Sequence, residues 1–433
     1  MLTNEMTVPH ITTAYRGPLH LLEKKILSQV NLIEDWFRKQ WTIYQPPLTT
    51  SVDLRHAGFK LAPVDTNLFP AGFNNLNAEF LPLCVQAMQA TLANYQTGCK
   101  RVLILPETHT RNPFYTQSLS VLRGIVQKAG YEVRIGSLDG EKQAPYEVTA
   151  ASGETILYEP VIRKDNHIMI DGFKPCLVLL NNDLSSGIPD SLKGLEQTIL
   201  PTTQLGWTSR LKSTHFRFYK QVAQQFAELI DIDPWLVNPD YASVEGIDFM
   251  AQEGLEQCAQ AVDTLLSQVK QHYQEKGIRE TPFAVVKADN GTYGMSVMMV
   301  HDGDDVRNMN RKLRTKMAAS KGSQKVSRVI VQEGVHTFET VDGGAVAEPV
   351  VYMIGPYVVG GFYRVHQGRG RDENLNAPGM HFVPLAFAEP CNMPDISDDE
   401  NSPNRFYIYG VIARLGALAA AYELAAIESK ERL

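Results

Sequence analysis

Three neighbouring segments of this chain alternate between the patterns of a strand and a helix. Residues 100–107 (KRVLILPE) form a short apolar run of strand-forming residues. Residues 116–130 (TQSLSVLRGIVQKAG) place apolar side chains at helical spacing and end on a glycine, and residues 131–138 (YEVRIGSL) return to a strand pattern. A succession of strand, helix and strand predicts an α/β fold.

Polar side chains follow two of the predicted strands at the point where each strand ends. The second of these strands lies within residues 175–187 (PCLVLLNNDLSSG). In open α/β sheets, ligands bind beyond the carboxyl ends of strands, so these side chains are candidate binding residues. Asn and Asp also favour turns, and that alternative stays open. The residues are Glu107, Thr108, His109, Arg111 and Asn112 after the first strand, and Asn181, Asn182 and Asp183 after the second.

The pattern of elements divides the chain into four expected segments. A helix is expected over 18–41, another from about residue 213, a third over 254–275 and an Ala/Leu-rich one over 406–433 that packs against the protein. A second group of strands and a helix spans 283–335, and a hairpin turns at Gly355-Pro356. The predicted boundaries are 1–205 for an N-terminal helix and α/β domain, 206–280 for a helical connector, 281–345 for a subdomain with a Gly-rich loop, and 346–433 for a metal-binding subdomain with the C-terminal helix.

Composition excludes several classes of protein. Among 433 residues, 41 basic and 48 acidic side chains give a formal charge of −7, which disfavours binding to a nucleic-acid backbone. We find no apolar run of the roughly 18 residues that a membrane span needs, and no signal-peptide pattern at the N-terminus. The five cysteines are scattered and form no CxxC pair. We therefore expect free thiols, no disulfide framework, no zinc site and a cytoplasmic location.

Residues 285–300 (VVKADNGTYGMSVMMV) contain a turn that is more elaborate than a hairpin needs. Gly291 and Gly294 allow backbone N–H groups to approach an anion closely, and Thr292 adds a hydroxyl donor. Lys287, at the end of the first strand, supplies a positive charge for a phosphate. The alternative is a surface hairpin with a solvated lysine.

Further residues along the chain complete a nucleotide-binding pattern. Arg210 and Lys212 precede a helix. An apolar strand ends in Gln332 and Glu333, where the hinge of a nucleotide-binding site would contact the adenine. Oxygen donors suited to magnesium come from one carboxylate and two amides, and an arginine ends the hairpin that this carboxylate begins. These residues are Glu348, Asn374, Asn376 and Arg364.

Residues 206–390 resemble the ATP-grasp superfamily of carboxylate–amine ligases. The segment NLNAPGMHFVPLA is similar to the metal-binding segment of D-alanine–D-alanine ligases, with Asn374 where that family has a carboxylate. Nearly the whole chain resembles the proteobacterial glutamate–cysteine ligase family of ATP-grasp type. That resemblance rests on VDLRHAGFKLAPVDTNLFPAGFNNL, LPETHTRNPFY and VVKADNGTYGMSVM, in this order. It implies an ATP-grasp architecture with an N-terminal Rossmann-like domain, and formation of γ-glutamylcysteine from glutamate, cysteine and ATP with Mg²⁺.

The resemblance also suggests roles for individual residues. The ATP-binding residues would be Lys212, Lys287, Gly291, Thr292, Tyr293, Gly294, Gln332 and Glu333, with Arg364 and Lys287 as catalytic residues and Glu348, Asn374 and Asn376 as metal ligands. From their chemistry, the candidates for binding the α-carboxylate of an amino acid are Arg55, Lys60 and Arg111. Those for its α-ammonium are Asp53, Asp65 and Glu107, and those for a side-chain carboxyl are Asn67, Asn74 and Asn75.

Two alternatives stay open at this point. The motifs do not identify the amine acceptor, so a ligase for another pair of amino acids fits them as well. Asn374 in place of a carboxylate fits an ATP-binding protein that has lost its chemistry.

Overall fold

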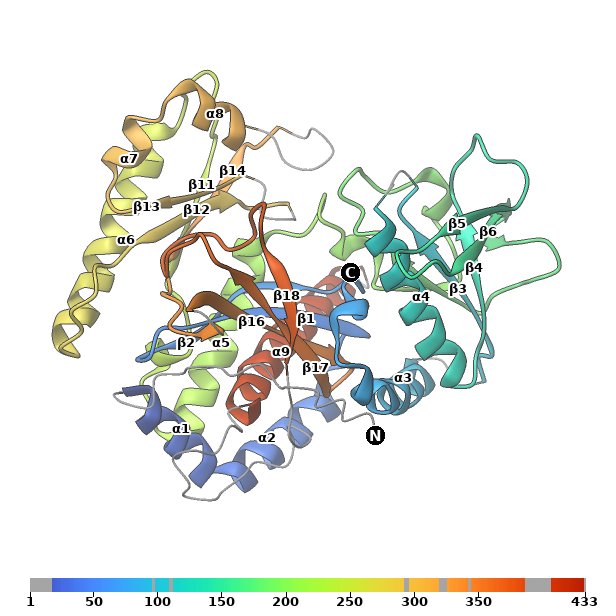
Figure 1. Cartoon of the computed structure of the whole chain (residues 1–433), viewed down its shortest axis with the longest axis horizontal. Coiled ribbons are helices and arrows are strands. Elements are labelled where there is room, and N and C mark those ends of the chain that lie inside the picture. The colour runs from blue at the N-terminus through green and yellow to red at the C-terminus, as the bar shows by residue number, and fades with distance from the viewer. Residues whose placement is uncertain are drawn as a thin grey trace, which may run out of the picture.

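The N-terminal and C-terminal parts of the chain build one antiparallel sheet. The computed structural model describes residues 18–95, 98–108, 112–291, 296–318, 325–341, 344–385 and 406–431. The sheet has the order β18-β17-β16-β1-β2, and β15 pairs with β16. Its strands are β1 (Thr49–His56), β2 (Leu61–Asn67), β15 (Thr340–Val341), β16 (Ala345–Ile354), β17 (Tyr357–His366) and β18 (His381–Pro384). We call it the central sheet, because the other parts of the chain surround it (Figure 1).

Helices pack on the central sheet through a large apolar core. Strand β16 is buried along its whole length, as expected of a strand made almost entirely of apolar residues. Side chains of the helices and of β1, β16 and β17 form one cluster of buried residues. These helices are α1 (Pro18–Ser28), α2 (Val30–Ile43), α5 (Lys212–Ile230) and α9 (Phe406–Glu431).

The predicted β-α-β unit belongs to a second, mostly parallel sheet. Its order is β10-β9-β3-β4-β6-β5, and only β5 pairs in the antiparallel sense. Helix α4 connects β3 to β4, and α3 packs beside α4 (Figure 1). The elements are α3 (Leu81–Tyr95), β3 (Arg101–Pro106), α4 (Pro113–Lys128), β4 (Glu132–Ser137), β5 (Tyr146–Thr149), β6 (Thr155–Pro160), β9 (Leu177–Asn181) and β10 (Thr198–Leu200), with a small hairpin of β7 (Ile162–Lys164) and β8 (His167–Met169).

The segment around the Gly-rich turn forms a third sheet, which is antiparallel and has the order β11-β14-β12-β13. Helix α6 packs on it, and α7 and α8 lie near its edge (Figure 1). The elements are β11 (Tyr241–Glu245), α6 (Leu255–Glu275), β12 (Ala284–Ala288), β13 (Val297–Val300), α7 (Asp304–Arg307), α8 (Arg311–Met317) and β14 (Arg328–Glu333).

The structure confirms a mixed α/β fold and corrects several expectations. The helix expected over 18–41 is two helices that meet at Gln29. The predicted boundaries place β1 and β2 in a different segment from β16, yet these strands share one sheet. Two cysteines form a disulfide, Cys99–Cys176, whereas Cys84 and Cys258 are free and buried. The disulfide was not predicted because its two residues are far apart in sequence and meet only when β3 and β9 pair.

Helix α9 is long and apolar enough to cross a membrane. Its stretch Tyr407–Ser429 contains an 18-residue window with a mean hydropathy of 1.5, but 78% of that window is buried inside the protein. The helix lies against the central sheet (Figure 1). It therefore packs as a core helix, as its sequence predicts.

Candidate active site

Two lysines from different elements meet at the β2 strand of the central sheet. Lys212 begins α5, and its Nζ lies 2.6 Å from Oδ1 of Asp65. Lys287, near the end of β12, donates from Nζ to the backbone oxygen of Val64 at 2.6 Å and to Oε1 of Gln332 at 2.8 Å. Lys212 and Lys287 are buried, whereas the Asp65 side chain is 26% exposed. We call these three residues the lysine cluster.

The pKa values in the lysine cluster follow from burial and from charge. Burial raises the pKa of the Asp65 carboxyl, but the charges of Lys212 and Lys287 outweigh it and lower the pKa to about 2. Burial lowers the pKa of Lys287 to about 8, and the charge of Lys212 acts in the same direction. Excess positive charge of this kind, held in a partly desolvated place, favours an anionic ligand.

Four charged side chains form a second cluster on strands β1, β16 and β17. Arg55 donates from Nε to Oε2 of Glu348 at 2.8 Å, and Arg364 donates to the other oxygen of the same carboxylate. Arg364 also reaches Asp53 at 3.0 Å. We call the series Arg55, Glu348, Arg364 and Asp53 the charge ladder.

The lysine cluster and the charge ladder are neighbours. Asp53 of the ladder lies opposite Asp65 in the pairing of β1 with β2. The pKa of Asp53 is raised chiefly by burial and also by the charge of Asp65, although Arg364 opposes this. Lys287 is in turn close enough for Asp53 and Arg55 to affect its pKa. The structure thus brings together predicted residues that lie hundreds of positions apart in the sequence.

Asp289, at the start of the Gly-rich turn, forms hydrogen bonds to the first residues of helix α5. Its side chain accepts hydrogen bonds from the backbone N and from Oγ of Ser213, both at 2.7 Å. Its backbone oxygen accepts from the N of Lys212 at 2.8 Å. Sequence reasoning missed this fully buried residue, although it stands directly in the DNG turn.

Arg210, which belongs to the nucleotide-binding pattern predicted from the sequence, instead bonds to the C-terminal helix through Glu423, a residue that sequence reasoning missed. Arg210 makes three hydrogen bonds to the carboxylate of Glu423 in α9, at 3.0 to 3.2 Å, and one to the backbone oxygen of Thr66 at 2.6 Å. His215 lies 3.3 Å from the same carboxylate. Burial raises the pKa of Glu423, but Arg210 and His215 lower it to about 2. The only available signal was an isolated acidic residue within an apolar helix.

Two predicted site residues pair with each other. Lys60 Nζ lies 2.7 Å from Oε2 of Glu333 and 4.0 Å from the centre of the Trp235 ring. The same Glu333 oxygen accepts from the backbone N of Asp240 at 2.9 Å. Within the described part of the chain, neither Lys60 nor Glu333 makes a hydrogen bond to the charge ladder, so their roles with substrate and adenine stay predictions.

Several other predicted residues lie elsewhere or outside the described ranges. Asn74 donates to Asn75 at 3.2 Å, and Asn67 ends β2 opposite Ser51. Gly291 has a φ of 144°, which only glycine adopts readily. Glu107 directly follows β3. The predictions for Thr292, Tyr293, Gly294, His109 and Arg111 fall on residues outside the described part of the chain.

The predicted magnesium ligands do not fit a metal ion as they are arranged. Both oxygens of Glu348 are bonded to guanidinium groups, which compete with a cation for them. The side-chain oxygen of Asn374 accepts from the backbone N of Asn376 at 2.9 Å. Within the described ranges, no three His, Cys, Asp or Glu side chains are grouped to hold a metal.

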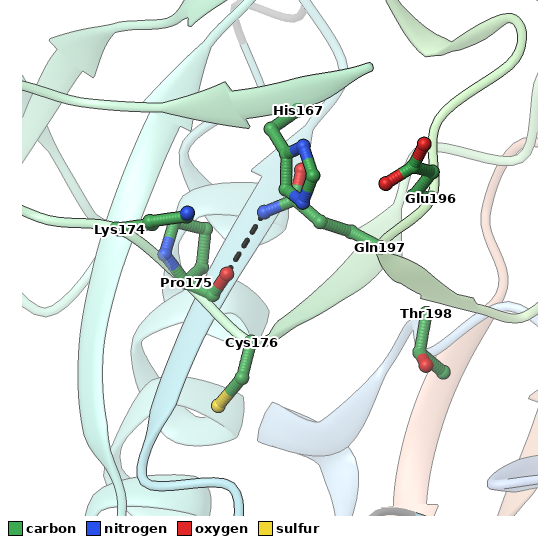
Figure 2. Close-up of a pocket in the computed structure, with 7 residues that line it drawn as sticks. All are labelled: His167, Lys174, Pro175, Cys176, Glu196, Gln197 and Thr198. Atoms are coloured by element: carbon green, nitrogen blue, oxygen red, sulfur yellow. Dashed lines mark hydrogen bonds between the residues drawn. The ribbon is translucent and has the colours of Figure 1, made fainter.

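A cavity of about 290 Å³ lies at the edge of the parallel sheet, apart from these residues (Figure 2). Gln197 crosses it and donates to the backbone oxygen of Pro175 at 2.8 Å. None of the predicted site residues lines it. Its lining residues are His167, Lys174, Pro175, Cys176, Glu196, Gln197 and Thr198.

The fold and the two charged clusters define a mixed α/β protein with a site suited to anionic small molecules. A family model described as Glutamate-cysteine ligase matches residues 23–424. The chain therefore belongs to the glutamate–cysteine ligase family. No curated protein matches the chain.

One of the solved structures compared with this chain agrees with the family assignment. It is a protein of Methylobacillus flagellatus KT, provisionally named a gamma-glutamylcysteine synthetase, with 55% identity and a TM-score of 0.89 over 98% of this chain and 100% of that chain. Another is a glutathione synthetase-like effector of Globodera pallida, with 9% identity and a TM-score of 0.35 over 85% and 80% of the two chains. A third is D-alanyl-alanine synthetase A of Vibrio cholerae, with 11% identity and a TM-score of 0.32 over 74% and 82%. The last two likenesses are too weak to carry an argument.

Proposed function

We propose that this protein joins the γ-carboxyl group of L-glutamate to the amine of L-cysteine, with ATP converted to ADP and phosphate. The product is γ-glutamylcysteine, the first intermediate on the way to glutathione. Membership of the glutamate–cysteine ligase family supports this reaction. The observation that carries the choice of ATP is the convergence of Lys212 and Lys287 on one place, where Asp65 is the carboxylate bonded to Lys212 and Lys287 is bonded to neutral oxygens. We also propose an ATP-grasp architecture with a Rossmann-like N-terminal domain, and a cytoplasmic location.

The proposed reaction has two steps. A γ-carboxylate oxygen of glutamate attacks the terminal phosphorus of ATP, ADP leaves, and an acyl phosphate forms. The cysteine amine then attacks the acyl carbon, loses a proton, and phosphate leaves with the electrons of the broken C–O bond. Phosphorylation is needed because an oxide is a poor leaving group from a carboxylate.

The residues of the two clusters have separate tasks in this proposal. Lys212 and Lys287 bind the phosphates and stabilise the charge that spreads over the transferred group. Arg364, which lies opposite Glu348 on the neighbouring strand and is also bonded to Asp53, stabilises the oxyanion of the second step. The Gly-rich turn that begins at Gly291 excludes water from the acyl phosphate. No step uses the predicted metal ligands Glu348, Asn374 and Asn376, because the structure does not arrange them for a metal.

The remaining substrate contacts are predictions from chemistry. Asp53 and Arg55 are the strongest candidates, since both belong to the charge ladder. Asp65 already binds Lys212, so it acts on the amino acid only if that pair opens. Lys60, Asn67, Asn74, Asn75, Glu107 and Arg111 complete the predicted set.

Substitution of Lys287 by alanine tests the proposal. Losing one charge-assisted contact to the triphosphate should lower kcat/KM for ATP roughly 10- to 150-fold. Release of ADP, measured with glutamate and cysteine together and with each alone, provides the rate. The matched control is Lys193→Ala, because the Lys193 side chain is 63% exposed and should leave the rate unchanged.

Three outcomes would contradict the proposal in different ways. Unchanged ADP release in Lys287→Ala would remove this lysine from the ATP site. Tight ATP binding by the unaltered protein without turnover would favour the inactive ATP-binding alternative. Full activity with alanine, serine or glycine in place of cysteine would favour a ligase for another pair of amino acids.

A further inference from the structure

The charge ladder holds Glu348 in the way that proteins hold a bound carboxylate ligand. One oxygen of Glu348 accepts from Nε of Arg55 at 2.8 Å, and the other accepts from a terminal nitrogen of Arg364. Guanidinium groups are the preferred partners of carboxylates because their donors match both oxygens. The Glu348 side chain is 4% exposed, so this pairing is almost fully removed from water. An internal carboxylate therefore fills a site built for carboxylates.

Asp53 lies beside that site, and its side chain favours a cationic group of a ligand instead of a carboxylate. It binds the second terminal nitrogen of Arg364 at 3.0 Å, so the carboxylates of Asp53 and Glu348 are neighbours on one guanidinium. An α-amino acid carries an ammonium group one carbon away from its carboxylate. If such a carboxylate took the place of Glu348, its ammonium group would lie near Asp53.

The balance of charge requires an anion between the two guanidinium groups. The ladder contains two arginines and two acids, all largely buried. Removing the charge of Glu348 leaves an excess buried guanidinium charge, which is costly until another anion replaces it. The same pairing accounts for the poor fit of Glu348 to a metal ion, because its two oxygens are already occupied.

We propose that Glu348 occupies the subsite for the α-carboxylate of an amino-acid substrate, and that the amino acid must displace Glu348 from Arg55 and Arg364 to bind. The ligand class is a zwitterionic α-amino acid, with Asp53 as the partner of its ammonium group. This inference rests on the proposed function only for the choice of L-glutamate as the probe. Glu348 thus acts as a built-in competitor that weakens binding of the substrate to the resting protein.

The test is the affinity for L-glutamate of the Glu348→Gln variant, measured by calorimetry without nucleotide or metal. Losing the internal competitor should tighten binding about tenfold, which is the low end of the range for a charge-assisted contact. The matched control is Glu34→Gln, because Glu34 also binds one arginine through both oxygens, at 2.8 and 2.9 Å from Arg414. The Glu34 pair joins α2 to α9 and should leave the affinity unchanged.

A second variant guards against misfolding of Glu348→Gln. Glu348→Asp keeps the charge but is one methylene shorter, so it spans the two guanidinium groups less well and should tighten binding by a smaller factor. Unchanged or weaker affinity in either folded variant would overturn the proposal. Glutarate, which has both carboxylates of glutamate and no ammonium group, should bind both proteins more weakly than L-glutamate, and equal affinity would overturn the role of Asp53.

These measurements separate the inference from the proposed function. They need no turnover, so a protein that binds L-glutamate more tightly as Glu348→Gln, but releases no ADP in its unaltered form, would support the subsite alone. A protein that releases ADP normally but shows no tightening would retain the function and lose the subsite.

Discussion

The charge of Lys287 changes within the pH range in which enzymes are usually assayed. Burial lowers its pKa to about 8, and its Nζ is bonded to two neutral oxygens, those of Val64 and Gln332. No carboxylate is bonded directly to Nζ among the contacts given for the described residues. The lysine therefore holds its proton weakly until an anion such as a phosphate arrives.

The Michaelis constant for ATP should rise as the pH increases through about 8, by up to roughly tenfold, as Lys287 loses its charge. Lys287→Arg should keep a flat profile because arginine stays protonated. In contrast to ATP binding, which weakens, the stability of the fold increases as the pH rises. Between about pH 8 and 10.5 the unfolded chain binds this proton and the folded chain does not, so the contribution of Lys287 to the free energy of unfolding increases with pH. If the Michaelis constant for ATP depended on pH in the same way in the unaltered protein and in Lys287→Arg, another group would be the one that titrates.

At the scale of elements, Asp289 joins the end of strand β12 to the start of helix α5. Through one side chain and its own backbone it fixes Ser213 and Lys212, and it follows Lys287 by two positions. A carboxylate at the N-terminal end of a helix also satisfies backbone N–H groups that otherwise have no partner in the helix. The positions of both lysines of the lysine cluster thus depend on this junction.

Asp289→Ala should lower the free energy of unfolding by about 1–2 kcal/mol, as loss of a helix cap does. It should also raise the Michaelis constant for ATP more than it lowers kcat, because Lys212 and Lys287 lose their fixed spacing. Chemical denaturation and steady-state kinetics measure the two effects. Ser213→Ala removes only the hydroxyl contact at 2.7 Å and should show a smaller change in both. A loss of stability with unchanged kinetics would limit Asp289 to a structural role.

The helices and strands were far easier to predict than the residue pairs that form between them. Local patterns were enough for the β3-α4-β4 unit, the strands on either side of the Gly-rich turn and the buried helix α9. The pairs Lys212–Asp65, Arg55–Glu348 and Lys60–Glu333 depend on which strands become neighbours, and no local pattern specifies that. The chemical types of these side chains predicted a charged site, whereas Asp289 and Glu423 gave no pattern that distinguished them from ordinary turn and helix residues.

At the scale of the whole molecule, the central sheet unites the two ends of the chain. Arg55 and Glu348 are 293 positions apart and still form a direct ion pair. Strand β1 pairs with β16 along five residues, from Thr49 to Asp53. Closing such a long loop costs entropy that only the finished core repays.

A fragment of residues 1–205 should fail to fold, because β1 would lack β16 and the α1–α2 pair would lack α5 and α9. Its circular dichroism should lack a cooperative thermal transition, and it should expose apolar surface. Co-expression with residues 206–433 is the control, and it should restore a folded complex. A cooperative transition in the isolated fragment would show that the parallel sheet and its helices are stable without the central sheet.

The Arg210–Glu423 contact affects the order in which the protein folds during its synthesis. Glu423 is translated 213 positions after Arg210, so Arg210 stays without its acid until α9 has been made. The start of α5, with Lys212, is anchored to α9 only then. We therefore expect a chain truncated before α9 to leave the start of α5 without this anchor, and to release no ADP in the assay with glutamate and cysteine.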